Sequence, residues 1–229
     1  MEEQKVGCVV MAAGNGARYG GNKLTVRLHG RSLIDRALDA ASSPQFCQVV
    51  VVTQYPDVEA LAGARGFQSL HNPHPDWGLS HTIRLGTEAL RDCGGILYLV
   101  SDQPLLTRRT IERIITQWRQ DPTRIVGAAH NGRRGNPCLF PREYFPELCA
   151  LNGDQGGTVV IRAHPERLIL VETSGDELSD VDTPEALRTL ANRPVTSSHK
   201  ASPSKEGHTA APRPAGNRRQ PPPGPSEWR

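Results

Sequence analysis

Three continuous apolar runs, at residues 6–13, 47–53 and 95–101, constrain the fold more than any other feature of the sequence. A strand with one face in water alternates apolar and polar residues, whereas a strand covered on both faces is apolar throughout. Each run is followed by polar or glycine-rich residues and then by a helical pattern. The repeated unit predicts an α/β fold of three layers, in which a mostly parallel, twisted sheet has helices on both faces.

The remaining periodic segments fit the same architecture. Helices are predicted at residues 32–41, 79–90, 107–118 and 182–190, and shorter strands at residues 125–129 and 167–171. Thr107 and Asp182 are expected to cap the third and fourth of these helices, because their side-chain oxygens can accept hydrogen bonds from the first amides.

The formal net charge of +3 is unevenly distributed. Residues 194–229 hold eight of the 19 prolines, six basic and two acidic side chains, whereas residues 1–193 hold 21 basic and 22 acidic ones. A nearly neutral body argues against a broad basic face for nucleic acid. We therefore predict one domain at residues 1–193 and a disordered, proline-rich basic tail at 194–229, with an SH3-type ligand or an electrostatic tether as the alternative interpretation of the tail.

The five cysteines are scattered and form no C-x-x-C pair, which is typical of a reducing compartment. No apolar run approaches the ~18 residues that a membrane span needs. The acidic start of the chain is unlike that of a secretory signal. We expect a cytoplasmic protein that binds neither membranes nor nucleic acid.

A glycine-rich loop directly follows the first apolar run. Ligands of such sheets bind at the carboxyl ends of the strands, and the amides of glycine-rich turns bind anions. Arg18 and Lys23 add permanent positive charge beside the glycines. The spacing fits neither the Walker P-loop nor the dinucleotide fingerprint. The loop predicts a triphosphate site, and the alternative is a glycine-rich turn with surface charges.

Two aspartates lie where a metal ion could be held. Asp102 ends the third apolar run, and Asp182 lies in the segment DVDTPE. Carboxylates near phosphates are the ligands of hard cations. Each aspartate alone is better explained as a helix or turn cap, so only convergence of the two would favour a metal site.

Several further segments are weaker candidates for a binding site. Ser80 and Thr82 open a helix, and glycine-flanked turns are predicted at residues 132–137 and 153–157. His71 and His74 lie between prolines that prevent a helix, so we interpret them as loop histidines rather than metal ligands.

Six segments together resemble a known family of enzymes. In order they are VVMAAGNGARYGGNK, HNPHPDWGLSHTIRLG, LVSDQP, GRRGNPCLF, LNGDQGG and DVDTPEAL. They resemble the molybdopterin-guanine-dinucleotide transferase-like nucleotidyltransferase superfamily and, more finely, its molybdenum cofactor cytidylyltransferase branch. Guanylyl enzymes have LAGG where cytidylyl enzymes have LAAG, and Ala13 follows the second pattern. The resemblance implies a nucleotide-diphospho-sugar transferase-like, Rossmann-like domain.

The resemblance also implies a reaction: Mg²⁺-dependent transfer of a cytidylyl group from CTP to the phosphate of molybdopterin or molybdenum cofactor, with release of pyrophosphate. Its partners would be these small molecules and a molybdenum hydroxylase client. The implied catalytic residues are Arg18, Lys23 and Asp102, and the implied metal ligands are Asp102 and Asp182. The implied nucleotide-binding residues are Ala12, Ala13, Gly14, Asn15, Gly16, Arg18, Lys23, Ser80 and Thr82. The implied acceptor-binding residues are Gly135, Asn136, Pro137, Gly153, Asp154 and Gly156.

The sequence departs from the family pattern at three positions. Ser101 stands where glycine is frequent, Thr158 where a basic residue is usual, and Ala186 where aspartate is common. The change at Thr158 concerns how the anionic groups of the acceptor are bound. Two alternatives stay open: a nucleotidyltransferase that uses GTP or another phosphorylated acceptor, such as a sugar or alditol phosphate, and a non-catalytic molybdenum cofactor carrier for hydroxylase maturation.

Overall fold

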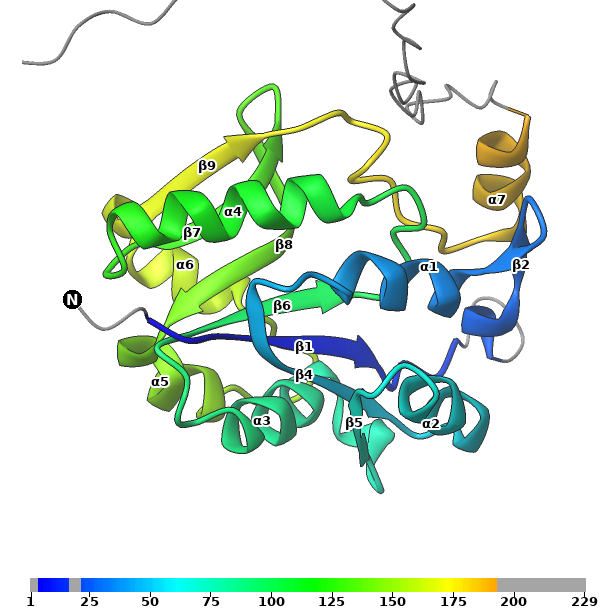
Figure 1. The fold of residues 1–229 in the computed structure, drawn as a ribbon, viewed down its shortest axis with the longest axis horizontal. Coiled ribbons are helices and arrows are strands. Elements are labelled where there is room, and N and C mark those ends of the chain that lie inside the picture. The colour runs from blue at the N-terminus through cyan, green and yellow to red at the C-terminus, as the bar shows by residue number, and fades with distance from the viewer. Residues whose placement is uncertain (1–3, 17–21, 193–229) are drawn as a thin grey trace, which may run out of the picture. The chain divides into compact units, whose positions relative to one another are not determined.

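A central sheet organises the computed structural model, which describes residues 4–16 and 22–192. In this part of the chain the sheet has the strand order β5-β4-β1-β6-β8-β7-β9 (Figure 1). The strands are β1 (Val6–Ala12), β4 (Phe46–Thr53), β5 (Gln68–His71), β6 (Gly95–Val100), β7 (Ile125–His130), β8 (Arg133–Pro141) and β9 (Leu168–Glu172). The predicted tail and Arg18 lie outside the described residues, so the division into domain and tail stays a prediction.

The three apolar runs form the centre of the sheet. Strand β1 lies between β4 and β6 and pairs with both in parallel, and β5 extends the parallel set beyond β4. Strand β8 runs antiparallel to its neighbours β6 and β7. The predicted α/β fold with a mostly parallel sheet is confirmed.

Helices cover both faces of the sheet (Figure 1). One face carries α1 (Leu33–Ala41), α2 (Pro56–Gly63) and α4 (Arg108–Gln120), and the other carries α3 (Leu79–Ala89), α5 (Phe145–Cys149) and α6 (Thr158–Ala163). Because successive side chains of a strand point to opposite faces, Val10 packs in the core under α1 and α4, whereas Val9 packs in the core under α3. Continuous apolarity of β1 follows from this double burial.

Two short strands and a terminal helix complete the described chain. Strands β2 (Arg27–Leu28) and β3 (Arg31–Ser32) form a small antiparallel pair, and α7 (Pro184–Ala191) follows the last loop. The N-cap of α7 is Thr183, whose side chain accepts a hydrogen bond from the amide of Ala186 at 3.1 Å. The expectation that Asp182 caps this helix is therefore wrong, because Thr183 directly precedes the first-turn proline and Asp182 is engaged elsewhere.

The glycine-flanked turn predicted at residues 132–137 is instead largely part of β8. Gly127 of β7 pairs with Cys138 of β8, but Ala129 pairs with Arg134, so two steps along β7 face four steps along β8. Three residues of β8, Gly135, Asn136 and Pro137, therefore lie opposite the single residue Ala128 of β7 and form a bulge. Bulges re-aim side chains beside binding sites, and this one carries Asn136 to a cavity wall.

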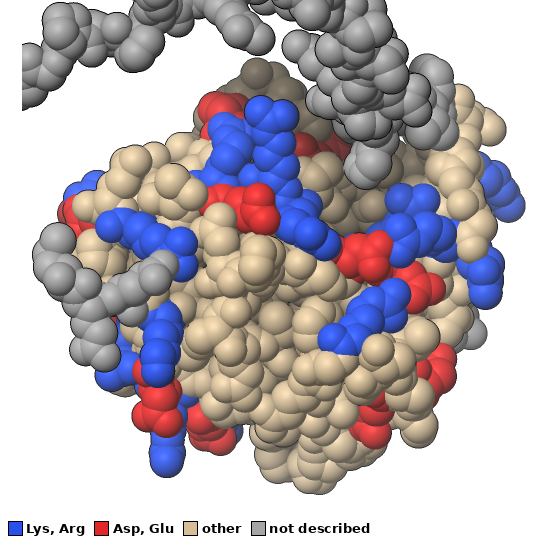
Figure 2. Space-filling view, viewed as in Figure 1, with Lys and Arg blue, Asp and Glu red and all other residues tan. Residues whose placement is uncertain are grey.

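Charged side chains of both signs are interspersed on the face shown in Figure 2 rather than gathered into one basic area. This agrees with the near balance of acidic and basic residues before the tail. Within the described residues, no helix combines the length and the apolar character that crossing a membrane requires.

Candidate active site

A cavity of about 540 Å³ opens at the carboxyl ends of β1 and β6, where ligands of parallel sheets bind. Its walls come from loops that are distant in sequence. Ten residues predicted for the site line it: Ala12, Ala13, Gly14, Asn15, Gly16, Lys23, Thr82, Asp102, Asp154 and Asp182. We call it the nucleotide cavity.

The loop after β1 is anchored by the last residue of β4 and the two residues that follow it. The hydroxyl of Thr53 donates to the carbonyl of Ala12 at 2.9 Å, Gln54 Nε2 donates to the carbonyl of Ala13 at 2.8 Å, and Tyr55 Oη donates to the carbonyl of Gly14 at 2.9 Å. In a planar trans peptide the N–H points away from the carbonyl of the same unit. The anchors therefore leave the loop amides on the opposite side, free to bind an anion.

These three anchors were absent from the residues predicted for the site. The sequence could have indicated these anchors, because Thr53, Gln54 and Tyr55 stand at the end of the second apolar run. That run forms the strand next to the one that carries the loop. Side chains at that edge of a parallel sheet meet those of the neighbouring strand.

Lys23 brings the two predicted metal ligands together. Its Nζ lies 2.8 Å from Asp102 Oδ2 and 2.9 Å from Asp182 Oδ1. The loops that carry the two aspartates are joined by a main-chain hydrogen bond of 2.9 Å from the amide of Val181 to the carbonyl of Asp102. Partial burial of Lys23 disfavours its charge, but the attraction of both carboxylates outweighs this and raises the pKa of Lys23. The lysine is therefore a fixed cation at neutral pH.

A third carboxyl group lies close by. Asp180 Oδ1 accepts a hydrogen bond from Gln103 Nε2 at 2.9 Å. Loss of hydration raises the pKa of Asp180, and the negative charge of Asp102 adds to this effect. Negative charge is therefore crowded where the metal ion was predicted.

Gly78 joins the segment that carries the predicted nucleotide-binding residues Ser80 and Thr82 to the turn before α6. Its φ is +86°, and a Cβ at this position would overlap the main-chain carbonyl of Gly153. The next turn is fixed by a hydrogen bond of 3.0 Å from the amide of Ser80 to the carbonyl of Gly153. Only glycine satisfies both the conformation and the close approach.

The substitution Gly78→Ala is expected to lower the free energy of unfolding by about 1–3 kcal/mol more than Gly30→Ala does. Gly30 is the matched control, because its φ is also positive, at +80°, but nothing lies within 4 Å of an added Cβ. Urea unfolding of both variants measures the difference. An equal loss in the free energy of unfolding for the two variants would show that a Cβ at residue 78 does not clash with Gly153.

Six predicted residues do not line the nucleotide cavity: Ser80, Gly135, Asn136, Pro137, Gly153 and Gly156. Ser80 is buried and contributes its main-chain amide, whereas the Thr82 hydroxyl accepts a hydrogen bond from Asn72 Nδ2 at 3.2 Å. Asn136 and Gly156 line a second cavity, Gly135 and Asn136 line a third, and Pro137 lines none of the three. Asp154, expected at the acceptor, lies in the wall of the nucleotide cavity.

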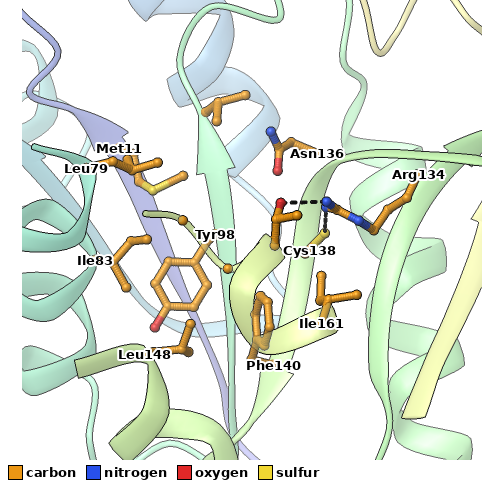
Figure 3. Close-up of a pocket in the computed structure, with 14 residues that line it drawn as sticks. Met11, Leu79, Ile83, Tyr98, Arg134, Asn136, Cys138, Phe140, Leu148 and Ile161 are labelled. Carbon is orange, nitrogen blue, oxygen red and sulfur yellow. Dashed lines mark hydrogen bonds between the residues drawn. The ribbon is translucent and has the colours of Figure 1, made fainter. Parts of the chain in front are cut away.

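The second cavity, of about 100 Å³, is mostly apolar (Figure 3). Ile83, Tyr98 and Phe140 surround it, and Arg134 and Asn136 lie at one end (Figure 3). It shares Met11, Leu79 and Val100 with the nucleotide cavity. We call it the apolar cavity, and its shared wall places it beside the nucleotide cavity.

Of the two histidines predicted to lie in a loop, His74 does so, whereas His71 is the last residue of β5 and that part of the prediction is wrong. The His74 ring stacks on Trp77, with centroids 4.0 Å apart and an angle of 9° between the planes. His71 Nδ1 lies 2.9 Å from Glu59 Oε1. Among the described residues, no group of three or more His, Cys, Asp or Glu side chains is arranged to hold a metal ion.

Comparison with structures of known proteins shows the same fold. Rv0371c of Mycobacterium tuberculosis matches 84% of this chain and 100% of its own, with a TM-score of 0.71 and 23% identity. A second structure of Rv0371c, in complex with manganese, has a TM-score of 0.66 and 24% identity, and matches 82% of this chain and 98% of its own. Molybdopterin-guanine dinucleotide biosynthesis protein A of Archaeoglobus fulgidus matches 81% of this chain and 96% of its own, with a TM-score of 0.63 and 18% identity.

Sequence comparison identifies the family. The purine catabolism protein PucB of Bacillus subtilis is 27% identical over 190 residues, which are 77% of this chain and 91% of PucB. The bifunctional protein GlmU of Albidiferax ferrireducens is 31% identical over 118 residues, which are 47% of this chain but only 25% of GlmU. Residues 8–168 match the MobA-like NTP transferase domain. The chain is therefore a nucleotidyltransferase of the MobA-like NTP transferase family.

Proposed function

We propose that the protein transfers a cytidylyl group from CTP to the phosphate of molybdopterin or molybdenum cofactor and releases pyrophosphate. The observation that carries the proposal is the meeting of the anchored loop, Lys23 and two carboxylates in one cavity. A phosphate oxygen of the acceptor is already a nucleophile, so the reaction needs no covalent residue and no strong base. What it needs from the protein is alignment of two phosphates and neutralisation of their charge.

The loop amides and Lys23 meet that need in different ways. The amides after β1 bind phosphate oxygens at fixed positions, because their carbonyls are held by Thr53, Gln54 and Tyr55. Lys23 offsets the charge that grows on the leaving pyrophosphate. Arg18, which lies outside the described residues, is proposed to do the same on the strength of the motif alone.

The carboxylates of Asp102 and Asp182 fit a divalent metal ion. Mg²⁺ is usually bound by one or two carboxylates together with the phosphates of the substrate, and these two carboxylates converge on one ammonium. When held by Asp102 and Asp182, Mg²⁺ would supply positive charge that offsets the charge of the substrate phosphates. The manganese complex of the structurally similar Rv0371c supports a divalent ion here.

Three observations support the finer assignment. Ala13, which follows the cytidylyl pattern, is buried in the wall of the nucleotide cavity. The adjoining apolar cavity has Tyr98 and Phe140 in its wall and Asn136 at one end, and so offers a packing surface and a hydrogen-bonding amide to a flat heterocycle such as a pterin. The A. fulgidus protein of similar fold is named for molybdopterin-guanine dinucleotide biosynthesis. We further propose that the protein acts in the cytoplasm, where its five free cysteines would stay reduced. We also propose that it delivers its product to a molybdenum hydroxylase.

Pyrophosphate release in the presence of molybdenum cofactor and Mg²⁺, measured separately with CTP, GTP, ATP and UTP, tests the proposal. We expect the highest kcat/KM with CTP. A strong preference for GTP would contradict the role given to Ala13. Binding of the cofactor without release of pyrophosphate would identify a carrier, and release only with a sugar or alditol phosphate would identify another acceptor.

Deletion of residues 195–229 is expected to leave kcat/KM within about twofold of the full chain, because every segment of the site precedes residue 190. The same pyrophosphate assay on both proteins measures this. A fall in kcat/KM of tenfold or more would show that the tail takes part in substrate binding.

A further inference from the structure

We propose that Arg134 binds a second anionic group of the acceptor, together with the hydroxyl of Thr158 and the side-chain amide of Asn136. The inference rests on the proposed function, since it concerns the acceptor of the same site. The inference defines the class of acceptor more narrowly. The acceptor would have a reacting phosphate at one end, an apolar or aromatic body, and a second negative group apart from that phosphate.

Arg134 lies at the junction of two cavities. With Asn136 and Thr158 it lines both the apolar cavity and a third, polar cavity of about 440 Å³. Figure 3 shows its side chain reaching the apolar cavity near Asn136 and Cys138. Met11, which the apolar cavity shares with the nucleotide cavity, lies across the cavity from Arg134 (Figure 3). A molecule whose phosphate reacts in the nucleotide cavity would therefore present its far part to Arg134.

The charge of Arg134 is not neutralised within the described residues. Its Nη2 donates to Thr158 Oγ1 at 2.6 Å, and its Nη1 donates to Cys138 Sγ at 3.3 Å and to the carbonyl of Gly135 at 3.4 Å. No carboxylate of the described chain forms an ion pair with it. Guanidinium groups bind oxyanions through paired N–H donors, so this partly buried cation is available to an anionic ligand.

Other arginines of the described chain show how a structural arginine is bound here. Arg65 Nη2 pairs with Asp35 Oδ1 at 2.7 Å. Arg84 and Arg142 hold loop carbonyls, with Nε donating at 3.1 Å to that of Cys149 and at 2.8 Å to that of Cys93. The shortest contact of Arg134 is instead to a hydroxyl in the wall of a cavity. That hydroxyl accepts from Arg134 and keeps its own proton for a ligand.

The position of Arg134 explains the departure at Thr158. The resembling family has a basic residue at that position, and here the guanidinium of Arg134 reaches the same point from β8, 2.6 Å from the Thr158 hydroxyl. Positive charge at this point is therefore supplied by Arg134 of β8. Asn136, which the bulge of β8 carries to the same place, adds an amide donor.

Steady-state kinetics of Arg134→Met test this role, with molybdenum cofactor as acceptor and CTP as nucleotide. We expect the KM for the acceptor to rise about tenfold to hundredfold, with the KM for CTP and kcat within about twofold of wild type. Arg162→Met, which removes an exposed arginine of α6, is the matched control. Adding Thr158→Lys to Arg134→Met should restore most of the acceptor KM, which a purely structural arginine would not allow. An unchanged acceptor KM, or a parallel rise in the KM for CTP, would overturn the inference.

Binding of inorganic phosphate to the CTP-saturated protein, measured by calorimetry, separates failure of this inference from failure of the proposed function. If wild type releases no pyrophosphate with any acceptor, the proposed function is wrong. Wild type should nevertheless bind phosphate, and Arg134→Met should raise the Kd at least tenfold. Equal binding by both proteins, or none by wild type, would overturn the inference even in an active enzyme.

Discussion

Asp102→Asn is expected to lower kcat/KM for CTP by about a hundredfold to a thousandfold, the range found when one charge-stabilising group is removed from an active site. Asparagine keeps the shape of the side chain but removes the negative charge that faces Lys23 at 2.8 Å. The main-chain hydrogen bond from Val181 to the carbonyl of residue 102 is kept, so the two loops stay joined. Pyrophosphate release as a function of CTP and Mg²⁺ concentration measures the effect, and the Mg²⁺ concentration for half-maximal activity should rise.

Stability should change far less than activity in this variant. The Asp102 side chain is 23% exposed, and Lys23 keeps Asp182 as a partner, so we expect a loss below about 1 kcal/mol in the free energy of unfolding. Asp39→Asn is the matched control, because Asp39 pairs with Arg31 and Arg65 at a distance from the cavity. If Asp102→Asn loses stability in proportion to activity, or behaves like the control, Asp102 has no direct part in the reaction.

Much of the fold was predictable because burial leaves a direct mark on sequence. Strands β1, β4 and β6 are covered on both faces, so their residues are apolar without alternation. The loop after β1 and Asp102 after β6 were predicted as site residues for a related reason, since the carboxyl ends of parallel strands share one edge of the sheet. Strand β8 gave no such signal, because its bulge is defined by pairing with β7 rather than by a local pattern.

The centre of the site depended on contacts that one sequence does not display. Lys23 is separated from Asp102 by 79 residues and from Asp182 by 159, and only the folded chain shows that both carboxylates meet its ammonium. Arg134 stands in the segment GRRGNPCLF, but its role depends on its contact with Thr158, 24 residues away. Asp182 was misassigned as a helix cap because Thr183 beside it can serve equally well.

Lys23→Met is expected to lower kcat/KM by about a hundredfold or more while it strengthens the binding of Mg²⁺ to the free protein. The lysine has two roles that this substitution separates. It offsets charge on the phosphates, and it occupies the space between Asp102 and Asp182, with Nζ within 2.9 Å of both. Because the two carboxylates raise the pKa of Lys23, its ammonium is charged at neutral pH and competes with a metal ion for them.

Thermal unfolding with and without Mg²⁺ distinguishes these roles, because a ligand at free concentration L that binds only the folded state stabilises it by RT ln(1 + L/Kd), so tighter binding gives a larger rise in Tm. Lys23→Met should show a larger Mg²⁺-induced rise in Tm than wild type, whereas Asp102→Asn should show a smaller one. Activity falls in both variants, so the opposite sign of the Mg²⁺ effect is the informative result. If Lys23→Met responds to Mg²⁺ no more strongly than wild type, Asp102 and Asp182 do not share a metal ion, and the contacts of Lys23 with them serve only to join three loops.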